Sequence, residues 1–172
     1  MLKVNQKKIG IIGLIVAVVS CVGTFLALVP ENQRSDWLRL FTIGKPIVVK
    51  PAGWQNTGIY IGKDNIVEIT YSSGAWANCE LSCPFTDGRG IENSLPYTDA
   101  NIIDGCLHGA LIARLVFDPV DTDLSRPSSM PAFCVGNHYY GSIGYSGYLQ
   151  LASNDGFDFD NRGDITVIIK IR

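Results

Sequence analysis

The segment from residue 154 to residue 164, NDGFDFDNRGD, gathers more oxygen-bearing side chains than any other part of the chain. Calcium binds six to eight oxygens from carboxylates, amides and backbone carbonyls, and glycine lets the backbone curl around the ion. Asp155, Asp158, Asp160 and Asn161 therefore predict a calcium site. The same residue types also build exposed hairpin turns, so a plain turn is the alternative interpretation.

Two familiar motifs overlap this segment, and neither fits. Asp158, Asp160 and Gly163 imitate the start of an EF-hand loop, but Arg162 stands where a ligand belongs and no glutamate closes the loop. The tripeptide from Arg162 to Asp164 matches a cell-adhesion signal, yet three residues recur by chance, and Gly163 is better explained as a turn into the last strand. We expect neither activity.

Four of the five cysteines, Cys79, Cys83, Cys106 and Cys134, follow the apolar N-terminal segment. In an exported domain such an even set favours two disulfides, and three pairings are open. A zinc site is the alternative, but only Cys79 and Cys83 have a suitable spacing. A thiolate nucleophile would need a base such as His108, and disulfide bonding would remove the thiol. No pair of carboxylates is placed for glycoside hydrolysis either, so no enzyme and no catalytic residue is predicted.

The charge balance argues against a nucleic-acid partner. The chain has 14 Lys and Arg against 16 Asp and Glu, with a net charge of -2. Nucleic-acid binding needs a surplus of basic residues gathered on one face, and no such surplus exists here.

The elements that must position these residues are strands. Alternating or β-branched patterns bounded by Gly, Pro, Asn and Asp occupy residues 47–49, 57–61, 66–72, 110–117, 148–151 and 164–171. In 66–72, Val67, Ile69 and Tyr71 point to one face and Glu68 and Thr70 to the other. The segment 110–117 is apolar except for Arg114, which indicates a buried strand, and residues 73–105 are predicted to form one long loop. We expect an all-β sandwich over residues 46–172.

The N-terminal segment predicts a membrane anchor. Residues 9–29 contain no charged side chain and follow Lys3, Lys7 and Lys8. As a helix they would be ~31 Å long, which matches the hydrocarbon thickness of a bilayer. The lysines favour a cytoplasmic tail at 1–8, a transmembrane helix at 9–29, a stalk at 30–45 and a periplasmic or extracellular domain. Cleavage as a signal peptide, or lipidation at Cys21, are the alternatives.

A series of short motifs follows the order found in one known family. The blocks are Gly53 to Gly58, Val67 to Ile69, Ser73 to Trp76, Asp87 to Gly90, Gly109 to Arg114, Ser146 to Leu151, Asn154 with Asp155, and Asp160 to Gly163. By their order and spacing, residues 48–171 resemble the bacterial galactophilic-lectin-like domain.

The resemblance implies a jelly-roll-like β-sandwich in which a calcium ion before the last strand is contacted by sugar hydroxyls. By position, Asp155 resembles the first carboxylate ligand, and Asp160 and Asn161 the later ones. Backbone carbonyls near Phe157 and Asn78 would complete the shell. The residues expected to contact the ligand are Asp87, Trp76, Asp158 and Asn154.

The chain also departs from that family. Asp160 and Asn161 follow Asp155 about two residues sooner, Phe159 replaces a small polar residue, and the loop of Asp87 lacks the His and Gln that would touch a sugar. Calcium is therefore better supported than galactose. The sequence predicts a membrane-anchored, extracytoplasmic module that binds calcium and a carbohydrate. The alternative is an envelope protein–protein interaction module with structural calcium or none.

Overall fold

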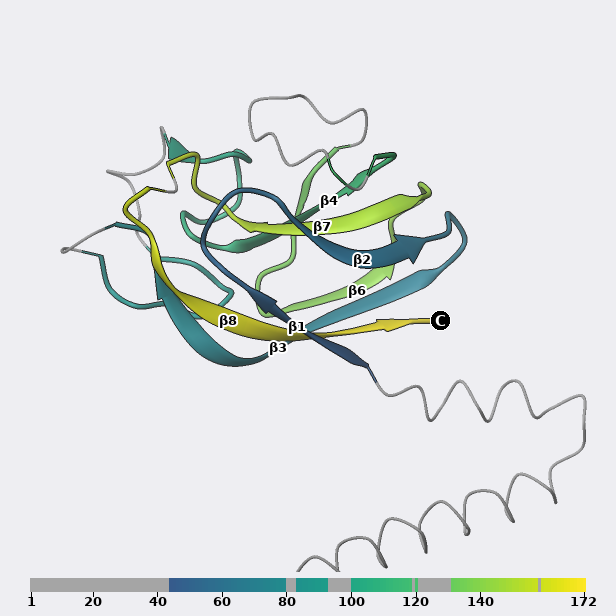
Figure 1. The fold of residues 1–172 in the computed structure, drawn as a ribbon, viewed down its shortest axis with the longest axis horizontal. Helices are drawn as coiled ribbons and strands as arrows, with labels where there is room; N and C mark the ends of the chain where they lie inside the picture. Colours follow the sequence, from purple (N-terminus) through teal and green to yellow (C-terminus); the bar gives the residue numbers. More distant parts are fainter. Residues whose placement is uncertain (1–43, 80–82, 93–99, 119, 121–130, 158) are drawn as a thin grey trace, which may run out of the picture. The chain divides into compact units, whose positions relative to one another are not determined.

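The structure is a computed structural model that describes residues 44–79, 83–92, 100–118, 120, 131–157 and 159–172. In this part of the chain the regular elements are strands (Figure 1). Their bounds are β1 Lys45–Val49, β2 Gln55–Ile61, β3 Ile66–Ala77, β4 Leu111–Val116, β5 Phe133–Cys134, β6 His138–Ser142, β7 Gly147–Ser153 and β8 Arg162–Ile171. The prediction of an all-β domain is confirmed.

The strands form two antiparallel sheets that pack as a sandwich. One sheet has the order β1-β8-β3-β6 and the other β2-β7-β4-β5. The main core lies between them, because it combines Val67, Ile69 and Val167 of the first sheet with Leu115 and Leu149 of the second. Burial of these side chains supplies the main driving force for folding.

The predicted alternation in β3 is confirmed. Val67 and Ile69 are buried and Tyr71 packs against the core, whereas Glu68 lies on the other face beside Lys170 and Arg172. A strand with one face in the core and one in water keeps this period of two.

The strand β4 is buried at all six positions, as its apolar sequence predicted. Leu111, Ala113 and Leu115 face the other sheet, whereas Ile112 lies in a second cluster with Trp54, Cys106 and Ala152. This second cluster covers the outer face of the sheet, which explains why β4 shows no alternation between apolar and polar residues.

Two sequence-based expectations about the strands are wrong. The long loop predicted for residues 73–105 begins later, because β3 continues to Ala77 and pairs with β8 as far as Arg162. The strand β6 was not predicted; it is a half-exposed edge strand with the sequence HYYGS, and within the described part of the chain it pairs with β3 alone. An edge strand exposes more of its surface and so carries less apolar signal.

The two ends of the sandwich carry different parts of the chain. Lys45 at the start of β1 lies opposite Ile169, and Ile66 exchanges backbone hydrogen bonds with Arg172, so the domain begins and ends at one end (Figure 1). The turn between β7 and β8 lies at the other end. The predicted tail at 1–8, the anchor at 9–29 and the stalk at 30–45, except for its last two residues, lie outside the described residues, and Lys45 belongs to β1. Within the described residues no helix has the length and apolar character of a membrane span.

Candidate functional site

Three of the predicted calcium ligands, Asn78, Asp155 and Asn161, lie at the end of the sandwich that carries the turn between β7 and β8. Asn78 directly follows β3, and Asn161 directly precedes β8. Because Ala77 and Arg162 are paired across these strands, Asn78 and Asn161 lie side by side. Asp155 lies two residues beyond the end of β7, and its carboxylate lies next to the Asn78 amide.

Asp155 is a buried carboxylate, with a relative exposure of 4%. Its Oδ1 accepts a hydrogen bond from the backbone N–H of Phe157 at 3.0 Å, and its Oδ2 lies 3.4 Å from Nδ2 of Asn78. A carboxylate that accepts a backbone N–H two residues on fixes a tight turn. The carboxylate therefore faces Asn78 while its own turn is held in place.

Asn78 and Asn161 each use the amide nitrogen and leave the amide oxygen unused. Nδ2 of Asn78 donates to Ser153 Oγ at 2.6 Å, and Nδ2 of Asn161 donates to the Pro51 carbonyl at 2.7 Å. Both Oδ1 atoms are buried, and neither accepts a hydrogen bond from the described residues. A buried acceptor without a donor costs about 1 to 3 kcal/mol.

Asp155, Asn78 and Asn161 carry carboxylate and amide oxygens, the oxygen types that a hard cation such as calcium accepts. The hydrogen bonds place the amide nitrogen of Asn78 toward Asp155 and its Oδ1 toward Gly109. Asp160 is half-buried one residue before Asn161, and Asp158 lies outside the described residues. Among the described residues no group of three His, Cys, Asp or Glu converges on one point, so an ion here would depend on amide and carbonyl oxygens as well.

A groove of about 380 Å³ adjoins this place and is lined by Phe85, Thr86, Asp87, Arg89, Gly90 and Glu92. Phe85 connects this groove to the start of β8. Its ring lies 5.1 Å from the Arg162 guanidinium carbon and closely against Gly163, the first two residues of β8. Phe85 therefore joins the lining of the groove to the start of β8.

Asp87, a predicted ligand contact, is already engaged by the protein. Arg89 forms an ion pair with it at 3.0 Å, and Asn137 Nδ2 donates to its Oδ2 at 3.0 Å. Partial burial opposes ionisation of Asp87, but the hydrogen bonds from Arg89 and Asn137 outweigh it, so the pKa of Asp87 lies below its usual value. The carboxylate stays ionised in the groove.

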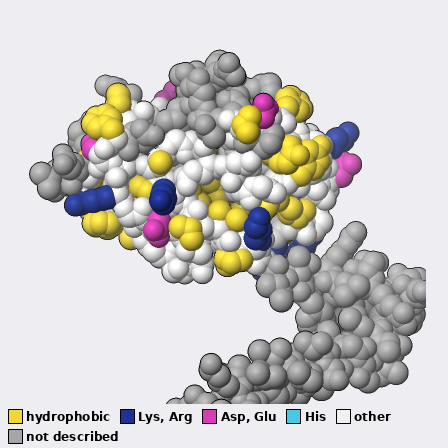
Figure 2. Space-filling model, viewed as in Figure 1, with side chains coloured by type: hydrophobic (Ala, Val, Ile, Leu, Met, Phe, Trp, Pro, Cys, Tyr) yellow, Lys and Arg dark blue, Asp and Glu magenta, His cyan; other side chains and the backbone are white. Residues whose placement is uncertain are grey.

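On the face drawn in Figure 2, the described Lys and Arg side chains are scattered among Asp and Glu and form no patch of one sign.

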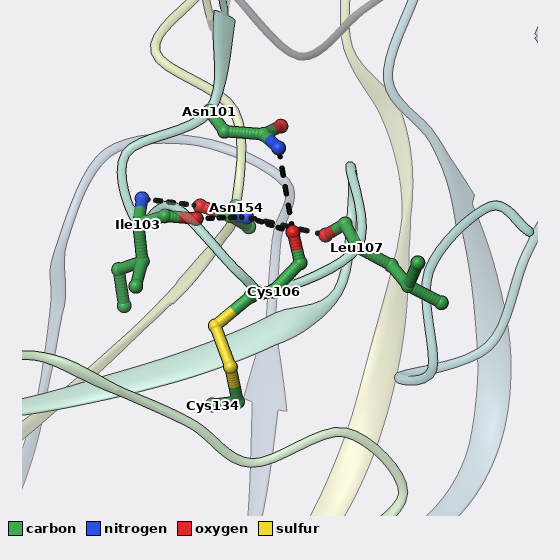
Figure 3. The surroundings of a disulfide bond; sticks show 6 residues. All are labelled: Asn101, Ile103, Cys106, Leu107, Cys134 and Asn154. Atoms are coloured by element: carbon green, nitrogen blue, oxygen red, sulfur yellow. Dashed lines mark hydrogen bonds between the residues drawn. A yellow bond between two sulfur atoms is a disulfide. The ribbon is translucent and has the colours of Figure 1, made fainter. Parts of the chain in front are cut away.

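Two of the predicted ligand contacts turn out to be internal residues. Trp76 is 0% exposed in the main core and donates its indole N–H to the Gly109 carbonyl at 2.9 Å, so its ring is not available for stacking on a sugar. Asn154 is also 0% exposed, and its side chain binds backbone groups of the loop 100–108 (Figure 3). Only the tertiary contacts reveal these roles.

Phe157 and Phe159 project from the turn instead of packing in it. Their side chains are 58% and 85% exposed, and the two rings meet edge to face with centroids 6.4 Å apart. The notable aromatic feature of the site is therefore this exposed pair. The sequence carried a signal for it, since two phenylalanines interrupt an otherwise polar turn.

The structure also shows which cysteines pair. Cys79 bonds to Cys83, and Cys106 bonds to Cys134. The first disulfide directly follows Asn78, and the second fixes the loop 100–108 to β5. With all four sulfurs bonded, none of these cysteines offers a thiol for metal binding or nucleophilic attack.

Comparison with known proteins finds matches among solved structures. No family model matches the chain, and no curated protein sequence matches it. Among solved structures that match is one described as "EclA N-terminal domain; PllA-like lectin", with 24% identity and a TM-score of 0.49, covering 76% of this chain and 96% of that one. At this level of similarity the match assigns neither a ligand nor a site residue.

Proposed function

We propose that this chain is a calcium-dependent carbohydrate-binding module, displayed outside the cytoplasm by an anchor at residues 9–29. The observation that carries the proposal is the buried carboxylate of Asp155 beside Asn78, at the strand ends where Asn78 and Asn161 each keep a buried amide oxygen that accepts no hydrogen bond from the described residues. The order of sequence blocks typical of galactophilic-lectin-like domains supports the same function.

In this proposal the chain's own residues divide the work. Asp155, Asn78 and Asn161 hold the ion, with Asp160 beside them. Calcium, when bound, would neutralise the carboxylates and offer coordination positions to ligand hydroxyls. Asp87 and Arg89 present an ionised acceptor and a donor in the adjoining groove, which suits the paired hydroxyls of a sugar. No step requires catalysis, and we propose a binding role only.

Calorimetric titration of the full chain with calcium, and then with a panel of galactosides and envelope glycans, tests the proposal. We expect a calcium Kd of about 0.1 to 1 mM, as in exposed extracellular modules. Asp155→Asn keeps the shape of the side chain and should weaken calcium binding at least about tenfold, because the charge is lost. Asp64→Asn, the same change at an exposed turn, is the control. Absence of calcium binding by the unmodified chain would refute the proposal.

A second candidate is a protein-interaction module, and the exposed Phe157 and Phe159 pair favours it. Two neighbouring rings at 58% and 85% exposure form an apolar surface that a protein partner would cover. Under this alternative, calcium binds but no glycan does, and Phe157→Ser with Phe159→Ser abolishes capture of an envelope protein without changing the calcium Kd. A glycan signal that survives the double substitution favours the lectin function.

A further inference from the structure

Asn154 connects the turn that carries Asp155 to the body of the domain through several side-chain hydrogen bonds. Its Oδ1 accepts the Ile103 N–H at 2.8 Å. Its Nδ2 lies within 3.1 Å of the carbonyl oxygens of Ile103 and Cys106, and 3.2 Å from that of Leu107 (Figure 3). One fully buried side chain thus binds three residues about fifty positions away in the sequence.

The backbone on both sides of Asp155 is held as well. Asn154 donates its N–H to the Ala110 carbonyl at 2.8 Å and accepts from Gly109 at 3.1 Å. Gly156 donates to the Ala100 carbonyl at 2.6 Å. The residues before and after Asp155 are therefore bound to the loop 100–108 and to the segment that leads into β4. These hydrogen bonds restrict the backbone that carries the Asp155 carboxylate.

A disulfide fixes the loop itself. Cys106 is bonded to Cys134 of β5, with the two Cα atoms 5.7 Å apart, and β5 pairs with β4. The Cys106 carbonyl accepts from Asn154 and also from Asn101 Nδ2 at 3.3 Å. The same residue thus forms the covalent link to the sheet and the hydrogen bond to Asn154.

We infer that Asn154 and the Cys106–Cys134 disulfide are positioning residues for the Asp155 site: they hold the carboxylate toward Asn78 before any ligand arrives. The inference rests on the proposed function for the identity of the ligand, calcium. The hydrogen bonds and the disulfide on which it is argued do not depend on that function. It assigns Asn154 to the support of the site, not to contact with the ligand. Preorganised ligands bind more tightly because less freedom is lost on binding.

The test compares two disruptions in the full chain. Asn154→Ala removes the side-chain hydrogen bonds, and Cys106→Ala with Cys134→Ala removes the disulfide while keeping Asn154. Amide hydrogen exchange is measured without calcium at Gly156 and Phe157, and at Val167 in the core strand β8. We expect exchange at Gly156 and Phe157 to accelerate at least about tenfold more than at Val167, because local hydrogen bonds are lost.

Calcium affinity is the second measurement, made at a temperature where every variant is folded. We expect Kd to rise about tenfold in both variants, whereas a loss of overall stability alone would leave it unchanged. Asn65→Ala is the matched control, because Asn65 also fixes a turn, accepting from Gly62 N–H at 2.7 Å, but at the opposite end of the sandwich.

The outcomes separate the two proposals. Equal acceleration at Gly156, Phe157 and Val167 in both variants would overturn the positioning role, whatever calcium does. If the unmodified chain binds no calcium, the proposed function fails, and the exchange measurement alone decides the inference. If Asn154→Ala does not fold, the cysteine variant provides the same comparison.

Discussion

At the scale of single residues, Asp87 shows how a predicted ligand contact becomes part of the structure. Its carboxylate is bound by Arg89 and by Asn137, which lies fifty positions away in the sequence. These donors favour the ionised form and lower the pKa of Asp87, although partial burial acts in the opposite direction. A carboxylate engaged in this way contributes to stability only while it is ionised.

The pH dependence of stability follows from the sign of this shift. The folded pKa is below the unfolded value of about 4, so the folded state binds fewer protons in the interval between them. The contribution of Asp87 is full above about pH 4 and disappears as the pH falls through the folded pKa. We expect Asp87→Asn to lower the free energy of unfolding by about 0.5 to 1 kcal/mol at pH 7, a small value because Arg89 is largely exposed.

Urea unfolding at pH 7 and at successively lower pH values measures this contribution. The difference between the unmodified chain and Asp87→Asn should shrink as the solution is acidified below about pH 4. Asp64→Asn, the same change in an exposed turn, is the matched control. A difference that grows on acidification would contradict the assignment.

At the scale of elements, the pairing of β3 with β8 positions the site and depends on one glycine. Gly163 has φ +87°, in the left-handed region, and lies opposite Trp76 in the ladder. A Cβ there would lie 3.1 Å from the Trp76 Cα and also close to the Ala75 carbonyl oxygen. The strands can approach this closely only because residue 163 has no side chain.

Gly163→Ala should therefore destabilise the domain by more than the cost of placing alanine in the left-handed backbone conformation. Gly105 is the control, because its φ is +86° and an added Cβ would meet nothing within 4 Å. We expect Gly105→Ala to cost about 1 to 2 kcal/mol for the left-handed backbone, and Gly163→Ala about 2 to 4 kcal/mol, because the contact adds to that cost. Equal losses in urea unfolding would show that the ladder tolerates a Cβ at this position.

At the scale of the whole domain, the two disulfides differ in what they connect. Cys79 and Cys83 are four residues apart, whereas Cys106 and Cys134 are 28 apart and join a loop to a different part of the sheet. The stabilising effect of a crosslink increases with the length of chain that it closes, since it restricts the unfolded state more.

Removing each pair with alanine should give unequal losses in the free energy of unfolding. For Cys106 and Cys134 we expect about 3 to 4 kcal/mol, and for Cys79 and Cys83 about 2 kcal/mol. Denaturant unfolding of the two double variants measures the difference. A larger loss for the shorter loop would mean that native contacts near Cys79, and not the unfolded chain, determine the effect.

Much of the fold could be predicted from the sequence. The strands β1, β2, β4, β7 and β8 were placed to within a few residues, because each has a local pattern of side chains that repeats with the pleat of a strand. The faces of β3 followed from the same pattern. The strand β6 was missed since an exposed edge strand lacks that pattern, and the end of β3 was missed because pairing with β8, not local sequence, extends it.

The sequence by itself determined the all-β class, the chemistry of the turn at residues 154–164 and the cysteine set, since residue types and their periodicity are local properties. Only the tertiary structure decided which cysteines pair, that Trp76 and Asn154 are internal, and that Asn78 lies beside Asn161 and Asp155. These facts are contacts between residues far apart along the chain. They form when the two sheets pack and the loop 100–108 folds over β4, and no short stretch of sequence records that arrangement.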